Sequence, residues 1–253
     1  MNLRLDVAYN GAPFHGYARQ NELRTVQGDL ERALQRVFGR ELNSTCAGRT
    51  DAGVHAAGQV VSVPGVPTGA DLPKAKDSLN GMLGPAISVS RINYVDDDFS
   101  ARFSARSRLY VYALLESEIP DPFLAATTLW HRRPLDLEAM NEAAGHLVGA
   151  HDFSSFGRVV EGATAQRSLF ELRCKRAGKL IRIRARANAF IQQMVRSLVG
   201  TLVYVGEGRR SPDEMPAILS SRDRATAGPV APPHGLCLVS VEYDDGWSGP
   251  GAG

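Results

Sequence analysis

A single carboxylate, Asp51, lies in the segment Cys46–Val63, which reads CAGRTDAGVHAAGQVVSV. The glycines on either side of it, Gly48 and Gly53, permit backbone conformations closed to other residues and let a ligand approach the main chain. A carboxylate held in such a loop is a candidate catalytic group. An aspartate in a turn also commonly forms an Asx turn or a cap, so the residue types alone leave both roles open.

A nearby histidine, His55, does not make this segment a metal site. One aspartate and one histidine are too few ligands, and the segment offers no other acid and no paired cysteines. We therefore expect His55 to be a packing residue and expect no metal ligands. The chain also has neither a Walker P-loop nor a GxGxxG fingerprint, so no nucleotide cofactor is indicated.

A second group of candidate residues is a run of arginines in Leu180–Ala187. Arg182, Arg184 and Arg186 alternate with apolar residues, so a strand here presents one apolar face and one row of guanidinium groups. The surrounding stretch is rich in basic residues and contains one acid, Glu171. The row is either a solvated outer face or a surface that binds phosphates through bidentate contacts.

Two tyrosines, Tyr110 and Tyr112, share one face of a predicted strand with Arg108. Tyrosines two residues apart often pack against neighbouring strands. They can also stack on unpaired nucleic-acid bases, where each stacked base contributes about 1–3 kcal/mol. The residue types leave both interpretations open.

The composition places further limits on the class of protein. The chain has 253 residues and a net charge of +2, enough to bury a substantial core in one or two domains. Its first residues lack the features of a signal peptide, and no apolar run reaches the length of a membrane span. The three cysteines are odd in number and lack metal-ligand spacing. We therefore expect a reduced, cytoplasmic protein without structural zinc.

The apolar periodicity predicts an α+β fold rather than a doubly wound parallel sheet. The predicted strands are Leu3–Tyr9, Leu42–Ala47, Gln59–Val63, Ile87–Tyr94, Ser107–Glu116, Arg167–Arg176, Lys179–Ala187 and Leu236–Tyr243. The predicted helices are Val26–Val37 with Thr25 as its cap, Pro73–Leu83, Leu137–Leu147 with Asp136 as its cap, Phe190–Val205 and Pro212–Ser220.

These elements predict two halves, each with a mainly antiparallel sheet backed by helices. We expect an N-terminal half over residues 1–118, a connecting segment over 119–134, a C-terminal half over 135–245 and a disordered tail over 246–253. A cleft between two such halves is a usual place for an active site, and we expect it there.

Several segments together resemble the TruA-type tRNA pseudouridine synthases. The longest is GRTDAGVHA at Gly48–Ala56, followed by Gln59 and Val60. The others cover nearly the whole chain in the family's order, and they are Arg19-Gln20, Thr25–Gly28, Asp98–Ala105, Arg108–Tyr112, His151–Phe156, Asn188–Phe190, Met194–Arg196, Val199-Gly200 and Gly235-Leu236.

The resemblance implies the pseudouridine synthase fold and an isomerase that converts uridine to pseudouridine at positions thirty-eight to forty of the tRNA anticodon stem-loop, without a cofactor. It implies that Asp51 is the nucleophile and that Tyr110, Arg49 and Arg196 bind the substrate. Arg182, Arg184 and Arg186 are the candidates for RNA contact. It also implies a homodimer that binds tRNA across both protomers and does not associate with membranes.

Two other hypotheses remain from the residues themselves. A non-catalytic tRNA-binding or tRNA-folding module would use the arginines and the tyrosines alone. A glycosidase-like enzyme would normally need a second positioned carboxylate, and the segment around Asp51 offers only one.

Overall fold

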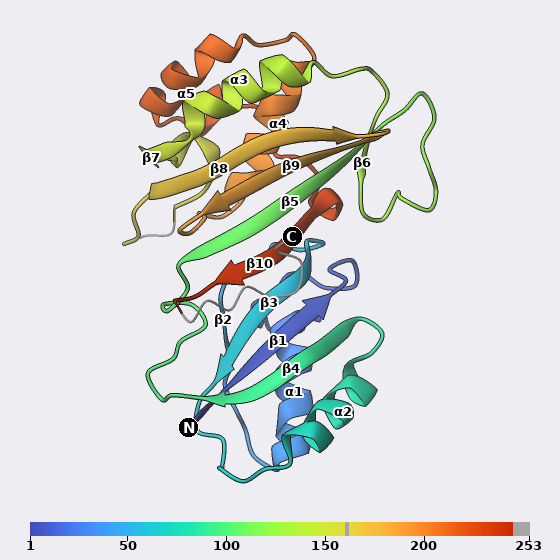
Figure 1. Cartoon of the computed structure of the whole chain (residues 1–253), viewed down its shortest axis with the longest axis vertical. Helices are drawn as coiled ribbons and strands as arrows, with labels where there is room; N and C mark the ends of the chain where they lie inside the picture. Colours follow the sequence, from blue (N-terminus) through green and yellow to red (C-terminus); the bar gives the residue numbers. More distant parts are fainter. Residues whose placement is uncertain (160–161, 245–253) are drawn as a thin grey trace. The chain divides into compact units, whose positions relative to one another are not determined.

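The computed structural model describes residues 1–159 and 162–244 and divides the chain into two compact units (Figure 1). Unit 1 consists of Met1–Arg108 and the chain from Cys237 onward, and unit 2 is Leu109–Leu236. Each unit combines mainly antiparallel strands with helices. The α+β class predicted from the sequence is therefore confirmed. The predicted tail, 246–253, lies outside the described residues.

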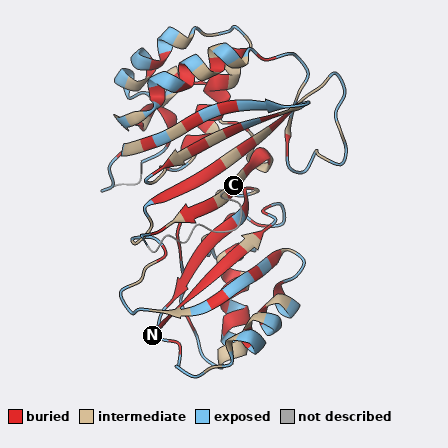
Figure 2. Ribbon diagram, in the orientation of Figure 1, coloured by how far each residue is buried: buried red, intermediate tan, exposed pale blue. Residues whose placement is uncertain are grey.

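The sheet of unit 1 has the strand order β4-β1-β3-β10, and the short strand β2 pairs with β3. These strands are β1 (Asn2–Tyr9), β2 (Thr45–Cys46), β3 (His55–Val63), β4 (Ile87–Val95) and β10 (Leu236–Glu242). β1 runs antiparallel to both β3 and β4, with Leu5 opposite Val61, whereas β10 runs parallel to β3. β1 and β3 are buried along nearly their whole length, and their apolar side chains belong to the core of this unit (Figure 2).

Two helices pack in unit 1, α1 (Val26–Phe38) and α2 (Leu72–Leu83). α1 begins where the sequence predicts, because the Thr25 hydroxyl accepts a hydrogen bond from Gly28 N. It ends at Gly39, whose φ of 69° is the left-handed conformation of a glycine C-cap. α2 packs on β4 and against α1.

Unit 2 has the strand order β5-β9-β8-β7, and β6 pairs in parallel with β5. The strands are β5 (Ser107–Glu116), β6 (Leu129–His131), β7 (Gly149–Asp152), β8 (Gln166–Ala177) and β9 (Leu180–Ala187). β8 and β9 form a hairpin in which Ala177 pairs with Leu180. Gly178, with a φ of 60°, takes the first position of the two-residue turn, as a II′ turn requires.

The helices of unit 2 are α3 (Leu137–Leu147), α4 (Met194–Gly206) and α5 (Met215–Ser221), with 3₁₀ turns η1 (Ser154–Phe156), η2 (Pro212–Glu214), η3 (Arg224–Thr226) and η4 (Pro233–Gly235). α3 packs on β8 and on α4. Figure 2 shows exposed outer surfaces on α3 and α5, while much of α4 is buried. No helix in the described ranges is long and apolar enough to cross a bilayer.

The structure differs from the predicted elements at several places. α4 begins at Met194 rather than Phe190, since Gln193 has a φ of 65° that no α-helix accommodates. The predicted strand Leu42–Ala47 is reduced to β2, and β3 extends back to His55. β6 and β7 have too few residues for a clear alternation, so the sequence pattern does not reveal them.

The division into units also differs from the predicted halves. The boundary falls after Arg108, where the sequence analysis placed it at residue 118, and the C-terminal strand returns to unit 1. The physical reason is long-range pairing, because β10 adds to β3 through Cys237 opposite His55. Periodicity within a segment cannot reveal which distant strand it will pair with.

Candidate active site

The segment 48–54, here called the Asp51 loop, joins β2 to β3 in unit 1. Cys46 pairs with Val61, and Ala47 N then donates to Val60 O at 2.9 Å, so the strands stay together up to the base of the loop. Asp51 is half-buried in this loop. Its carboxylate is thus carried by a short connection whose two ends are fixed by the sheet.

The backbone of the Asp51 loop closes in a turn. Val54 N donates to Asp51 O at 3.1 Å, and Gly53 between them has a φ of 78°. A residue with a side chain is strained in this left-handed conformation. The expectation that a glycine is needed for its backbone conformation therefore applies to Gly53 and not to Gly48, which is not among the residues with positive φ. The N–H and C=O of Gly48 are both hydrogen-bonded to the side chain of Gln59.

The segment Asn10–Tyr17 lies against the Asp51 loop. Tyr17 N donates to Thr50 O at 3.0 Å, and Gly53 N donates to Phe14 O at 3.4 Å. These backbone bonds fix the loop on both sides of Asp51.

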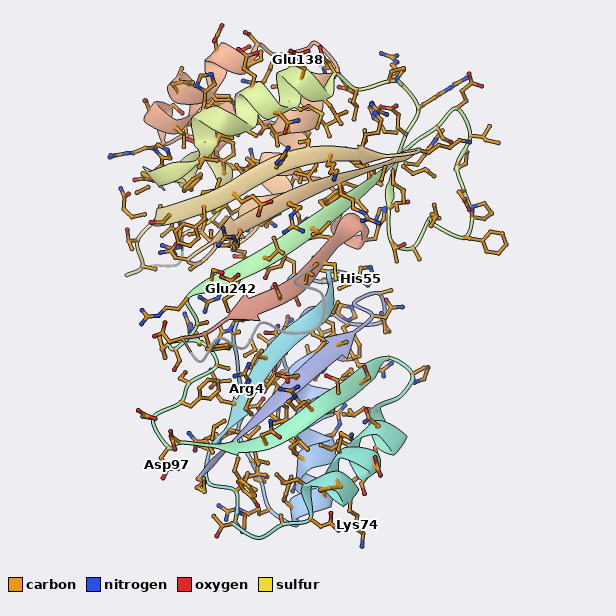
Figure 3. All side chains as sticks on the ribbon, in the orientation of Figure 1. Arg4, His55, Lys74, Asp97, Glu138 and Glu242 are labelled. Atoms are coloured by element: carbon orange, nitrogen blue, oxygen red, sulfur yellow. The ribbon has the colours of Figure 1, made fainter. Side chains whose placement is uncertain are left out.

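Close approach explains two glycines of this segment. A Cβ on Gly11 would lie 2.1 Å from Val54 O, and one on Gly16 would lie 3.1 Å from Thr50 O. His55, at the start of β3 (Figure 3), is buried, and its Nδ1 accepts a hydrogen bond from Gly11 N at 3.1 Å. This contact supports the expected packing role of His55.

Sequence reasoning assigned no structural role to three buried polar residues that hold the Asp51 loop. Gln59 binds the backbone of Gly48, and the Tyr9 hydroxyl binds the side chain of Thr50. Arg108 donates to Ala47 O at the base of the loop. Gln59 is wholly buried, and a lone amide within the apolar sequence HAAGQVVSV is the signal that could have identified it. Arg108 was expected only to share a strand face with Tyr110 and Tyr112.

Arg49 is exposed beside the buried thiol of Cys46. Burial raises the pKa of Cys46 to about 12, against an opposing contribution from the charge of Arg49. The thiol is therefore neutral at physiological pH and is not a nucleophile. Asp51 is thus the nucleophile candidate of this loop.

Both of the sequence-predicted tyrosines belong to unit 2. Tyr110 is largely buried, and its ring meets that of Phe190 edge-on at 5.2 Å between centroids. Tyr112 is completely buried and donates its hydroxyl to Pro232 O at 2.9 Å. Tyr112 is therefore a core residue, and the base-stacking alternative does not apply to it.

Arg196 lies in the first turn of α4 and is half-buried. Its Nε donates to Ala231 O at 2.7 Å, while Ala231 N donates to Arg196 O at 3.0 Å. Burial raises the pKa of Tyr112, and the positive charge of Arg196 partly opposes that rise. The guanidinium group of Arg196 is therefore anchored to the backbone of Ala231.

The predicted arginine row lies on β9 as expected. Ile181, Ile183 and Ala185 are buried, while Arg182 is exposed and Arg184 and Arg186 are half-buried. α3 packs on the buried face, so the arginines lie on the face without that helix. The hairpin adds basic residues of β8, with Arg173 opposite Arg184 and Lys175 opposite Arg182.

Glu171 neutralises part of this row. A register shift between Leu169 and Glu171 places Glu171 opposite Arg186. Its carboxylate lies 2.9 Å from Arg184 Nε and 3.9 Å from Arg186 Nε. An acid on the neighbouring strand β8 therefore pairs with two of the three arginines. Among the described residues, Arg182 is the member of the row with no carboxylate partner.

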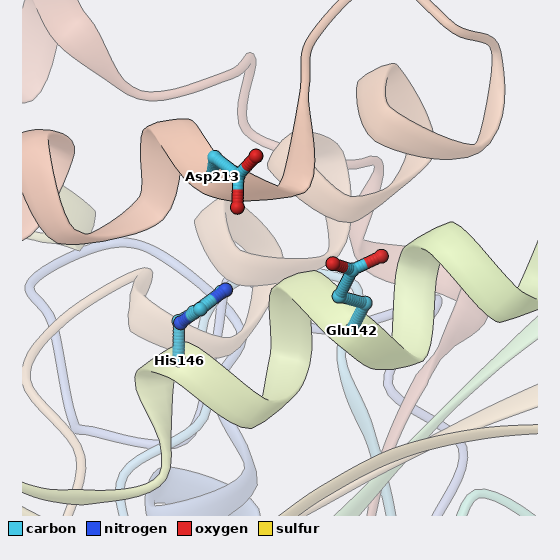
Figure 4. Close-up of side chains that lie close together, drawn as sticks. All are labelled: Glu142, His146 and Asp213. Carbon is cyan, nitrogen blue, oxygen red and sulfur yellow. The ribbon is translucent and has the colours of Figure 1, made fainter.

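Among the residues that the structure describes, one group of side chains could hold a metal ion, and it lies outside every predicted site. Glu142 and His146 project from α3 toward Asp213 of η2 (Figure 4), with ligand atoms within 4.8 Å of one another. All three residues are exposed. Exposed carboxylates and histidines commonly lie this close without an ion, and this group contains none of the residues that position Asp51.

The chain is similar to known proteins over nearly its whole length. Residues 143–244 match the family model described as tRNA pseudouridine synthase. The chain is 42% identical over 257 residues to tRNA pseudouridine synthase A of Paramagnetospirillum magneticum, covering 98% of each chain. It is 46% identical over 246 residues to tRNA pseudouridine synthase A of Frankia casuarinae, covering 96% of this chain and 89% of the relative.

A solved H/ACA RNP bound to a substrate RNA containing 2′-deoxyuridine is also similar, with a TM-score of 0.37 and 13% identity. The match covers 79% of this chain and 44% of that one.

Proposed function

The chain belongs to the tRNA pseudouridine synthase family and isomerises uridine to pseudouridine in tRNA, and from this premise we propose that Asp51 is its nucleophile. The observation that carries the proposal is the Asp51 loop, in which a half-buried carboxylate sits on a backbone anchored at Gly48, Thr50 and Gly53. A fixed backbone suits a residue that must meet one atom of a bound substrate.

The isomerisation moves one bond and one proton. The bond from uracil N1 to ribose C1′ breaks, a bond from C5 to C1′ forms, C5 loses a proton and N1 gains one. A carboxylate assists this exchange by attacking C1′, by attacking the uracil ring or by promoting elimination across the sugar. No oxidant and no activated water is needed, so one carboxylate is sufficient.

The substrate-binding residues of the proposal are Tyr110, Arg49 and Arg196. Departing uracil carries negative charge, which an arginine stabilises. The edge-on contact with Phe190 fixes the ring of Tyr110, which supports its proposed role in contacting uracil and accepting a proton. Arg196, anchored at Ala231, is similarly held.

Phosphate contacts are assigned to Arg182, Arg184 and Arg186. A uridine in a stem must leave its base stack to reach a carboxylate, at a cost of a few kcal/mol. Guanidinium groups offset such a cost through charge-assisted bonds to phosphates. The exposed and half-buried positions of these three side chains support that assignment.

The remaining features follow the family resemblance. We propose that the modified uridines are at positions thirty-eight to forty of the anticodon stem-loop, that the enzyme acts in the cytoplasm as a homodimer, and that it uses no cofactor. A non-catalytic RNA-binding module is not favoured, since the relatives matched over nearly the full chain are synthases.

The test is nucleotide-resolution mapping of pseudouridine in unmodified tRNA by carbodiimide tagging, in EDTA and without added cofactor. Wild type, Asp51→Asn and Asp77→Asn are compared, since Asp77 is an exposed aspartate of α2 that carries the same charge. We expect modification in the anticodon stem-loop by wild type and Asp77→Asn only, with tRNA binding retained by Asp51→Asn.

Pseudouridine formation by Asp51→Asn at the wild-type rate would overturn the nucleophile assignment. Modification by wild type at other tRNA positions would overturn the positional assignment and leave the role of Asp51 intact. Loss of activity on chelation, restored by a divalent cation, would overturn the proposal that no cofactor is used.

A further inference from the structure

Gln59, on β3, is the most deeply buried polar side chain near the Asp51 loop. Its relative exposure is 0%, and it lies opposite Val7 in the register of β1 and β3. Burying an amide costs free energy unless its donors and acceptor are all used. The partners of Gln59 therefore show what this polar group does in an otherwise apolar strand.

Both backbone groups of Gly48 are bound by the Gln59 amide. Nε2 donates to Gly48 O at 2.7 Å, and Oε1 accepts from Gly48 N at 3.3 Å. The opposite orientation of the amide would place donor against donor and oxygen against oxygen. Gly48 is the first residue of the Asp51 loop, so this clamp fixes the point where the loop leaves the sheet.

The second N–H of the Gln59 amide begins a chain of hydrogen bonds that leads toward Asp51. Nε2 also donates to the hydroxyl oxygen of Tyr9 at 3.3 Å, and that hydroxyl lies 2.8 Å from Thr50 Oγ1. Since the Tyr9 oxygen accepts from Gln59, its own proton is available to Thr50. A chain of side-chain hydrogen bonds thus runs from the sheet to the residue that directly precedes Asp51.

Gln59, Tyr9 and Thr50 are buried, but the segments that they join set them apart from ordinary core packing. Gly48 and Thr50 both belong to the Asp51 loop, while Gln59 and Tyr9 lie on β3 and β1. The side-chain hydrogen bonds of Gln59 end at Gly48 of the Asp51 loop and at Tyr9. A valine at position 59 would fill the apolar layer and leave the loop without its clamp.

We propose that Gln59 and Tyr9 are positioning residues of the isomerisation, acting on Asp51 through Gly48 and Thr50. The inference rests on the proposed role of Asp51. A displacement of about 1 Å between reacting groups lowers rates by about 100-fold, so release of the loop affects the chemical step more than tRNA affinity. The two residues need not touch the substrate to have this effect.

The test measures the single-turnover rate of pseudouridine formation and the tRNA dissociation constant for Tyr9→Phe, Thr50→Val and Thr50→Ser. Tyr9→Phe removes only the hydroxyl, and Thr50→Val replaces the hydroxyl by a methyl of similar size. We expect both to lower the rate by about 10- to 100-fold while the dissociation constant stays within about twofold. Thr50→Ser, which keeps the hydroxyl, restores most of the rate lost in Thr50→Val.

The matched control is Tyr243→Phe. Tyr243 is buried like Tyr9 and donates its hydroxyl to Ala101 O at 2.7 Å, away from the Asp51 loop. The control loses the same hydroxyl from the core of unit 1 without removing a hydrogen bond to the Asp51 loop, so it shows what loss of a buried hydroxyl does to the rate. We expect the rate of Tyr243→Phe to remain within about twofold of wild type even where its melting temperature falls as far as that of Tyr9→Phe.

Wild-type rates in Tyr9→Phe and Thr50→Val would overturn the inference, as would an equal loss in Tyr243→Phe or no recovery in Thr50→Ser. Asp51→Asn, measured beside them, separates this failure from that of the proposed function. An inactive Asp51→Asn with fully active Tyr9→Phe rejects the positioning role alone, whereas an active Asp51→Asn rejects the nucleophile on which it rests.

Discussion

Arg108 donates two hydrogen bonds to the carbonyl oxygen of Ala47, from Nε at 3.0 Å and from Nη2 at 2.9 Å. The same buried guanidinium group also donates to Ala105 O at 3.1 Å and to Arg102 O at 2.6 Å. Ala47 immediately precedes the Asp51 loop. One side chain therefore ties the loop base to the segment that leads into β5.

Replacement of Arg108 by methionine is expected to destabilise the protein by about 3 kcal/mol, because buried carbonyl groups lose their charged donors. Arg108→Lys should recover only part of this loss, since a single ammonium cannot reproduce the planar fork of donors. Thermal unfolding measures the effect. Arg106→Met is the control, because Arg106 is exposed and pairs with the exposed Asp244, and an unfolding midpoint as low as that of Arg108→Met would contradict the prediction.

A methyl group at Gly16 is expected to impair both folding and turnover. Gly16 has a φ of 100°, and its Cβ would lie 3.1 Å from Thr50 O and 3.3 Å from Ala52 N. Gly39 also has a positive φ, 69°, but its Cβ would meet nothing within 4 Å. Gly16→Ala and Gly39→Ala should each lose about 1–2 kcal/mol through backbone strain, while only Gly16→Ala slows pseudouridine formation.

Denaturant unfolding and single-turnover rates of the two glycine variants separate strain from displacement of the loop. Gly39→Ala controls for strain because it forms the C-cap of α1 rather than contacting the Asp51 loop. An unchanged rate in Gly16→Ala, with stability reduced in both, would show that the loop tolerates the added methyl.

Most local elements were predictable because their signals are local. The alternation in β5 and the caps Thr25 and Asp136 define those elements closely. The start of α4 was not predictable, since the apolar pattern continues back through Phe190 and only the positive φ of Gln193 ends the helix. Parallel pairing of β10 with β3 depends on residues far apart in the chain, which periodicity does not register.

The sequence motif predicted the residues of the candidate site, but it did not predict the hydrogen bonds that hold the Asp51 loop. Asp51 and Gly53 stand out by type and spacing, but the clamp of Gln59 on Gly48 joins residues on a strand and a loop. The same limit applies to Glu171, whose pairing with Arg184 follows from a register shift in the β8–β9 hairpin. Sequence spacing therefore identified the charges and missed their partners.

Burial of the thiols predicts slow alkylation in the native protein. Burial raises the pKa of Cys46 and Cys174 to about 12 and of Cys237 to about 11. The reactive thiolate is therefore scarce at pH 8. Mass spectrometry after iodoacetamide treatment at pH 8 should find little labelling of native protein and three labels in urea, with Cys237 labelled first.

The same thiols predict how stability changes in alkali. Because the folded protein keeps these thiols protonated, they contribute fully to the free energy of unfolding below the ordinary thiol pKa of 9.0. This contribution to stability falls as the pH rises from 9.0 toward about 12, because the unfolded chain loses these protons first. Unfolding midpoints measured from pH 7 to pH 11 should thus decline above about pH 9, and Cys174→Ser should reduce the slope. Rapid native labelling of Cys46 at pH 8 would contradict the burial on which both predictions depend.

The charge arrangement on β8 and β9 predicts opposite effects of two substitutions on tRNA affinity. Arg182→Gln should weaken binding and reduce the salt dependence by about one phosphate contact, because Arg182 has no carboxylate partner in the described part of the chain. Glu171→Gln should strengthen binding severalfold, since it releases Arg184 and Arg186 for phosphates. Dissociation constants at several salt concentrations measure both effects.

Glu138→Gln is the matched control for Glu171→Gln. Glu138 is an exposed acid of α3 (Figure 3), which packs on the buried face of β8, and its replacement changes the net charge by the same amount. A local effect requires that affinity rises in Glu171→Gln and not in Glu138→Gln. An equal rise in both variants would mean that net charge alone attracts the tRNA, and the arginine row would then lose its assignment as the RNA-contact surface.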